Sequence, residues 1–118
     1  SAEPSLSVDG EPQELHPVVR DEIYRIAYEA IRNACLHSAG KRIDVRLSYD
    51  RDLTVRVADN GVGIDPSMVD QGRQGHFGLK GMRERASRIE ATLSIISEPG
   101  AGTEIVLTVP GRVAFRKT

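Results

Sequence analysis

Several residue types that define common protein classes are scarce or missing in this chain of 118 residues. A single cysteine, Cys35, excludes an intrachain disulfide framework and a cysteine-based zinc site. No apolar run approaches the ~18 residues that a membrane-spanning helix needs, and no signal peptide is expected, since the first residues lack its basic and apolar regions. Tryptophan is absent and aromatic residues make up only 4%, so the core must be aliphatic.

An excess of charge of one sign is also missing. The chain has 16 Lys and Arg against 17 Asp and Glu residues, which gives a formal net charge of −1. This balance excludes a domain held on nucleic acid or on an anionic membrane by bulk charge. The 39% of hydrophobic residues and the 11 glycines are typical of a globular protein. We expect an N-terminal segment over residues 1–14, with Ser1 and Ala2 as a tag remnant, and a single domain over residues 15–118.

The spacing of apolar residues predicts two helices. A helix from Pro17 to about His37 has one apolar face. The residues expected off that face are Glu22, Arg25, Glu29, Asn33 and His37. A second helix is predicted from Leu79 to about Glu90.

Alternation of apolar and polar residues predicts the strands. Residues 43–49 and 53–57 form one hairpin, and residues 93–97 and 104–109 are two more linked strands. Alternation at Leu6 and Val8 allows a further short strand in the N-terminal segment. Hairpins thus alternate with helices, which predicts an α+β fold: a two-layer sandwich with the helices on one face of a mixed, mainly antiparallel sheet.

Three glycine-rich stretches stand at the ends of predicted elements: residues 59–63, 75–82 and 100–103. Glycine lets a backbone approach a ligand closely, and the free N–H groups at the start of the helix at Leu79 can hold a phosphate. Each stretch taken alone is more simply explained as a turn. The P-loop pattern is absent, and residues 61–66 lack the third glycine of the dinucleotide-binding fingerprint.

Two polar residues on the first predicted helix are candidates for chemistry. Glu29 and Asn33 are four residues apart, so they share one side of the helix. A carboxylate there could polarise a water or a hydroxyl, and an amide oxygen could bind Mg²⁺. A solvated helix surface is the alternative explanation for such a pair.

The order of these features along the chain is informative. Residues 29–33 on a helix are followed by residues 59–63 after a strand, by Gly78 and Leu79 opening a helix, and by Gly102 and Thr103 before a strand. This series resembles the GHKL superfamily, which includes DNA gyrase, heat-shock protein 90, MutL-type repair ATPases and sensor histidine kinases. Residues 24–34 (YRIAYEAIRNA) and 75–86 (GHFGLKGMRERA) are similar to the histidine kinase subgroup that includes the nitrate sensors. The resemblance extends from about Leu15 to Pro110.

The resemblance implies an ATP-binding site with assigned roles. Asp59 would accept the adenine amino group, Thr103 would lie near the adenine, and Gly61 and Gly63 would pass beneath the base. Asn33 would bind the Mg²⁺ that bridges the phosphates, and Glu29 matches the general-base position of the family, where in a kinase it assists or positions the attacking histidine. The other nucleotide-binding residues that it implies are His37, Ile64, Gly75, Phe77, Gly78, Leu79, Lys80 and Gly81.

Two features depart from a complete kinase. Three residues after the Mg²⁺-binding asparagine the subgroup commonly has Lys or Arg, whereas this chain has Leu36. None of the three histidines, His16, His37 and His76, has the sequence context of a phosphoacceptor. The phosphoacceptor histidine is therefore expected on a separate dimerisation domain.

The resulting hypothesis is a cytoplasmic, ATP-binding catalytic domain of a sensor histidine kinase whose parent protein is anchored in the membrane. With ATP and Mg²⁺, it would phosphorylate a histidine on the parent's dimerisation domain, for relay to a response regulator. One alternative is an anti-sigma-type Ser kinase or another GHKL ATPase. A second is a nucleotide-sensing module without catalysis, which Leu36 supports.

Overall fold

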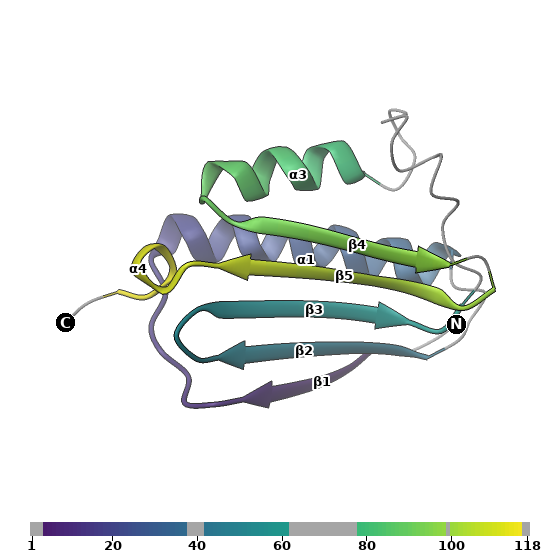
Figure 1. The fold of residues 1–118 in the computed structure, drawn as a ribbon, viewed down its shortest axis with the longest axis horizontal. Coiled ribbons are helices and arrows are strands. Elements are labelled where there is room, and N and C mark those ends of the chain that lie inside the picture. Colours follow the sequence, from purple (N-terminus) through teal and green to yellow (C-terminus); the bar gives the residue numbers. More distant parts are fainter. Residues whose placement is uncertain (1–3, 38–41, 62–77, 99, 117–118) are drawn as a thin grey trace.

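The structure is a computed structural model, and it describes residues 4–37, 42–61, 78–98 and 100–116. Its helices and strands are shown in Figure 1. In chain order they are β1 (Pro4–Asp9), α1 (Pro17–His37), β2 (Ile43–Tyr49), β3 (Leu53–Asp59), α3 (Leu79–Arg88), β4 (Thr92–Glu98), β5 (Gly102–Val109) and α4 (Gly111–Ala114).

The described strands form one sheet in the order β1-β2-β3-β5-β4. β1 pairs with β2 in parallel, and the other three pairs are antiparallel. The two predicted strand pairs at residues 43–57 and 93–109 are thus confirmed, as is the short strand in the N-terminal segment. Both long helices lie on one face of this sheet, so the predicted two-layer α+β sandwich is confirmed (Figure 1).

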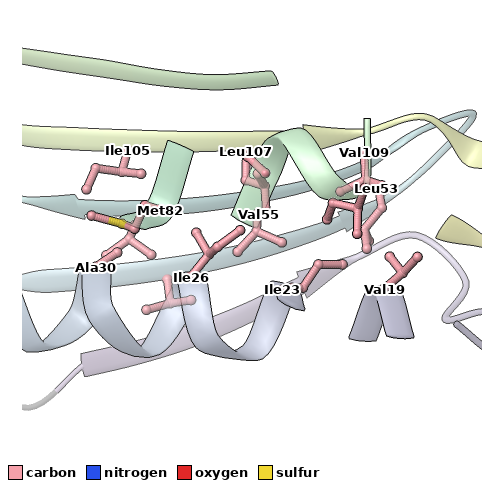
Figure 2. Packing of buried hydrophobic residues seen from close by; sticks show 14 of the residues in the cluster. Val19, Ile23, Ile26, Ala30, Leu53, Val55, Met82, Ile105, Leu107 and Val109 are labelled. Atoms are coloured by element: carbon pink, nitrogen blue, oxygen red, sulfur yellow. The ribbon is translucent and has the colours of Figure 1, made fainter. Parts of the chain in front are cut away.

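The core lies between the helices and the helix-facing side of the sheet. Alternate residues of β3 and β5 point into it because successive side chains of a strand face opposite sides. Figure 2 shows the apolar face of α1 packed against these residues, with Met82 of α3 among them. The largest fully buried side chains are Ile26, Ile43, Leu53, Met82, Leu107 and Val109, so the core is aliphatic as expected.

α1 runs along the sheet, so its turns match successive rows of the β3–β5 ladder. At one end of this core Val19 lies beside Leu53 and Val109 (Figure 2). Toward the other end lie Ala30 of α1 and Ile105 of β5, with Met82 of α3 between them in the view (Figure 2). The next turn of α1, which carries Asn33, therefore extends toward the last row of the ladder.

Some predicted element bounds were wrong near the ends. The predicted helix to Glu90 ends at Arg88 because Glu90 has a left-handed backbone (φ 56°). The N–H groups of Glu90 and Ala91 turn back to the carbonyls of Ser87 (3.2 Å) and Ala86 (2.9 Å), as in a Schellman motif. The last strand stops at Pro110 as expected, but this proline opens the short helix α4, which was not predicted.

Candidate functional site

The last row of the β3–β5 ladder is polar. Asp59 ends β3, Thr103 lies at the start of β5, and the two residues are direct partners in the ladder. Their side chains lie on the same side of the sheet as Val57 and Ile105, so they continue the line of core residues. Thr103 is buried and Asp59 is half-buried. At this end of the sheet the apolar core gives way to hydrogen-bonding groups.

The Asp59 carboxylate is held in place by the chain that follows it. Its Oδ1 accepts the N–H of Gly61 at 2.9 Å. Asn60 is tied to the residue before β2, since its Oδ1 accepts the N–H of Arg42 at 2.7 Å and its own N–H donates to the Arg42 carbonyl at 3.2 Å. Within the described part of the chain, no hydrogen bond to the other Asp59 oxygen, Oδ2, is found, so this oxygen can accept a ligand donor.

Gly102 brings β5 close to Asp59. Its φ is +99°, and a Cβ placed on it would lie 2.0 Å from the Asp59 carbonyl oxygen. Only glycine fits this approach, which sets Thr103 beside Asp59. At Gly102, the close approach expected of a glycine-rich stretch is therefore to the protein's own backbone and not to a ligand. Gly100 also has a positive φ (+82°), but a Cβ there would meet nothing within 4 Å.

α1 supplies two more of the predicted site residues, Glu29 and Asn33. The prediction that Asn33 lies off the buried face was wrong, since Asn33 is only 5% exposed. Asn33 lies one turn beyond Glu29 on a second flank of α1, which α3 covers from Glu29 back to Glu22. Glu22 on the same flank shows this contact directly, because its carboxylate pairs with Arg85 (3.1 Å) and Arg88 (3.5 Å) of α3.

Glu29 lies against the start of α3. Gly78, the residue before the helix, has a left-handed backbone (φ 61°), and a Cβ on it would come within 2.5 Å of Glu29 Oε1. The Glu29 carboxylate also pairs with Arg32 at 3.5 Å. A carboxylate is favourable at this position because the N-terminus of a helix carries partial positive charge.

The first backbone donors of α3 are open. The N–H of Met82 makes the first helical bond, to the Gly78 carbonyl at 3.0 Å. The preceding N–H groups, those of Leu79, Lys80 and Gly81, therefore have no acceptor within the helix. The N-cap residue is Gly78, so no N-cap side chain accepts a hydrogen bond from them. Such a group of donors suits an anionic ligand.

A groove of about 540 Å³ runs between α1 and α3 from this point. Its lining combines aromatic, cationic and carboxylate side chains. The lining residues are Tyr24, Arg25, Tyr28, Glu29, Gly78, Gly81, Met82 and Arg85. Sequence reasoning gave no role to Tyr24, Arg25 or Tyr28. The signal that could have found them is a pair of exposed tyrosines, one turn apart, next to Glu29.

Comparison with known proteins identifies the chain. Residues 18–113 match the family described as histidine kinase-, DNA gyrase B- and HSP90-like ATPase. The chain belongs to this ATPase family.

Curated relatives of this ATPase domain include a sensor protein and a histidine-protein kinase/phosphatase. The sensor protein VraS of Staphylococcus haemolyticus is 42% identical over 93 residues, which are 78% of this chain and 26% of the relative. The histidine-protein kinase/phosphatase DegS of Bacillus subtilis is 37% identical over 101 residues, 85% of this chain and 26% of the relative. The chain thus spans about a quarter of the length of these relatives.

Solved structures show the same fold. The histidine kinase domain of the blue-light activated histidine kinase of Erythrobacter litoralis has a TM-score of 0.76 at 22% identity, over 91% of this chain and 54% of that chain. The histidine kinase AdeS of Acinetobacter baumannii also has a TM-score of 0.76, at 14% identity, over 92% of this chain and 54% of that one.

The remaining candidate residues of the ATPase domain differ in their exposure to solvent. Lys80 is exposed at the start of α3, whereas the Leu79 side chain belongs to the core, so Leu79 can offer a ligand only its backbone. Leu36 is 61% exposed, which agrees with the expectation that it points away from the core. The candidates that lie outside the described residues are Gly63, Ile64, Gly75, Phe77 and the side chain of His37. No described helix is long and apolar enough to cross a membrane.

Proposed function

We propose that this chain is the ATP-binding catalytic domain of a cytoplasmic kinase module that transfers the γ-phosphoryl group of ATP to a histidine. The acceptor histidine would lie on the dimerisation domain of the same parent protein, and a response regulator would take the phosphoryl group from it. One observation carries this proposal. Near the end of α1 that carries Asn33 lie both a row of hydrogen-bond acceptors that suits a base and a helix N-terminus whose N–H groups suit phosphates. The ATPase family, the similar sensor protein and the similar histidine-protein kinase/phosphatase support it.

The base would be recognised by the polar row. Asp59 offers an anchored carboxylate whose Oδ2 can accept a hydrogen from the adenine amino group. Guanine carries a carbonyl at that position, so two oxygens would face each other with no hydrogen between them. An unmatched buried acceptor of this kind is costly. The pocket is therefore expected to prefer ATP to GTP.

The phosphates and Mg²⁺ would be held between α1 and α3. Asn33 is a buried amide one turn beyond Glu29 on the same flank of α1, so its side-chain oxygen fits a Mg²⁺ ligand. Mg²⁺ is typically held by one or two protein groups together with substrate phosphates, and it would supply neutralisation of phosphate charge. The N–H groups at the start of α3 and the exposed Lys80 would bind phosphate oxygens.

Glu29 lies where the phosphate region opens into the groove. An acceptor imidazole would approach the γ-phosphate from this groove. Neutral imidazole attacks through the lone pair of one ring nitrogen and carries its proton on the other. The Glu29 carboxylate would hold that N–H and stabilise the charge that develops on the ring, instead of removing a proton before attack.

Phosphotransfer to a supplied acceptor tests the proposal. The chain is mixed with the dimerisation domain of its parent protein and ATP labelled at the γ-phosphate. We expect acid-labile label on the acceptor histidine and none on the chain alone. Glu29→Gln should slow transfer by at least about tenfold, because a positioned acid–base group typically raises the rate by that factor or more. ATP affinity should change little. Glu84→Gln, an exposed glutamate on α3, is the matched control. Label on His16, His37 or His76, or an equal loss of transfer and binding in Glu29→Gln, would contradict the proposal.

The metal assignment has its own test. Asn33→Ala should abolish the enhancement of ATP binding by Mg²⁺, measured by calorimetry with and without the ion. Because Asn33 is buried, the change should also lower the free energy of unfolding by about 1–3 kcal/mol, so the fold must be checked by circular dichroism. Asn33→Asp keeps an oxygen ligand and should retain the Mg²⁺ effect. An unchanged Mg²⁺ enhancement in folded Asn33→Ala would remove the metal assignment.

A second candidate function is a nucleotide-sensing module without catalysis. The exposed Leu36 favours it, because an apolar side chain there gives no charge to the phosphates. The transfer experiment separates the two candidates: a sensing module binds ATP in a Mg²⁺-dependent manner but never labels the acceptor.

A further inference from the structure

The polar row extends one strand beyond Thr103. Ser97 of β4 is the partner of Thr103 in the β4–β5 ladder, and Thr103 is in turn the partner of Asp59. Ser97 lies on the same side of β4 as Leu93 and Ile95, which pack against the core. Ser97, Thr103 and Asp59 therefore form a continuous row across three strands, with Thr103 in the middle.

The contact of Ser97 with the Gly102 carbonyl favours one direction for the hydrogen bonds of this row. Ser97 Oγ donates to the carbonyl of Gly102 at 3.2 Å, and it lies 2.9 Å from Thr103 Oγ1. A hydroxyl has one proton and two lone pairs. Because the Ser97 proton is directed to Gly102, Ser97 meets Thr103 as an acceptor. The Thr103 proton then points to Ser97, and the Thr103 lone pairs are the groups left to meet a ligand.

We propose that Ser97 is a positioning residue for adenine recognition, because it makes the Thr103 hydroxyl an acceptor toward the base. This inference rests on the proposed function, in which Asp59 binds the adenine amino group. That group has two hydrogens, and Asp59 and Thr103 would accept one each. Thr103 would accept its hydrogen bond either directly or through one water, which accepts from the amino group and donates to Thr103.

The spacing of the row suits this arrangement. Two acceptors that each lie about 2.9 Å from one trigonal nitrogen are about 5 Å apart. Directly opposed residues of an antiparallel pair have their Cβ atoms about 4.5–5.5 Å apart. Asp59 and Thr103 are such a pair. Guanine would meet two acceptors with its 6-carbonyl, so the row selects for the amine and against the carbonyl.

Removing the Ser97 hydroxyl should therefore change base selectivity. In Ser97→Ala the Thr103 hydroxyl is free to rotate and donate to a carbonyl. We expect ATP affinity to fall by about 3- to 10-fold, the size of one hydrogen bond, and the ATP/GTP affinity ratio to fall by more. Binding of a purine ribonucleoside triphosphate without the 6-amino group should not change, because it has no hydrogen for Thr103 to accept.

The test is calorimetry of the full chain with ATP, GTP and the triphosphate that lacks the amino group. Ser97→Thr keeps the hydroxyl and should bind ATP as the unsubstituted chain does. Ser94→Ala, on the exposed face of β4, is the matched control. Thr103→Val removes the acceptor at similar shape. It should weaken ATP and spare the analogue without the amine, as Ser97→Ala does, and it can be measured even if Ser97→Ala does not fold. Adding Ser97→Ala to Thr103→Val should cause no further loss.

Three outcomes would overturn the inference. One is an equal loss of affinity for ATP and for the analogue without the amine, which would show that Ser97 only supports the fold. Another is unchanged selectivity in both folded Ser97→Ala and Thr103→Val. The third is a large further loss in the double variant. Asp59→Asn is measured alongside: if it weakens ATP while Ser97→Ala does not, only this inference fails. If Asp59→Asn also has no effect, the proposed adenine pocket fails with it.

Discussion

The two ends of the β3–β5 ladder differ in chemistry although they share the same strands and the same face of the sheet. At one end Leu53 and Val109 are partners and both are 0% exposed. At the other end the partners are Asp59 and Thr103. Five residues of β3 lie between Leu53 and Asp59. A ladder that is apolar for three rows and polar in the fourth stabilises the fold at one end and offers a binding site at the other.

The surroundings of the two ends agree with this division. The chain itself closes the apolar end: α4 places Ala114 against it with 0% exposure, the His16 N–H donates to the Ala114 carbonyl at 3.1 Å, and the Gly111 N–H donates to Asp52 at 3.0 Å. At the polar end α1 brings Asn33 into the same region. Changes at the first end should therefore alter stability, and changes at the second should alter binding.

The largest effect on stability is expected at the apolar end. Leu53→Ala should lower the free energy of unfolding by about 2–5 kcal/mol, the usual cost of a cavity left by a buried leucine. Denaturant titration measures this loss. The ATP affinity of the folded protein, measured by calorimetry, should stay the same. A parallel loss of ATP affinity would show that the two ends are not separate in function.

A substitution at the polar end should lower both the stability of the chain and its affinity for ATP. Gly102→Ala places a methyl group 2.0 Å from the Asp59 carbonyl at a positive φ, so it should destabilise the chain by more than the about 1–2 kcal/mol of left-handed strain alone, and it should displace Asp59 and weaken ATP. Gly100→Ala has the strain without the contact and is the matched control. Equal ATP affinity in the two variants would show that the approach of Gly102 to Asp59 does not hold the site.

The smallest effect is a gain. Leu36→Lys should add a phosphate contact worth ~0.2–1 kcal/mol, as for other partly exposed ion pairs. The gain should be larger for ATP than for adenosine and should shrink as salt rises, which calorimetry at two salt concentrations measures. Because Leu36 is 61% exposed, the variant should stay folded. A folded variant without any gain would contradict this contact and show that Lys80, His37 or Arg83 already supplies the positive charge at the phosphates.

Much of the fold could be predicted because its signals are local. Alternation is clear from Ile43 to Val57, and the apolar face of α1 has helical spacing throughout. The end of α3 could not be predicted, since its left-handed residue is Glu90 and not the usual glycine. The left-handed backbone is seen only when the chain is folded back on the sheet.

Some residues of the candidate site could likewise be predicted from the sequence, and others could not. The order of motifs predicted Asp59, Thr103 and Glu29 as a group, and the structure places Asp59 beside Thr103 and Glu29 beside the start of α3. The burial of Asn33 is a tertiary property of the folded chain, which helical periodicity does not contain. Ser97 gives no sequence signal at all, because its position beside Thr103 follows only from the register of β4 and β5.

Base selectivity tests the central claim, that the polar end of the ladder is an adenine pocket. ATP and GTP are titrated by calorimetry into the unsubstituted chain and into Asp59→Asn. We expect clear preference for ATP, and a loss of about 1–3 kcal/mol of ATP binding in Asp59→Asn, since an amide that presents its N–H₂ to the adenine amine leaves that amine unpaired. Equal affinity of the unsubstituted chain for ATP and GTP would contradict the account.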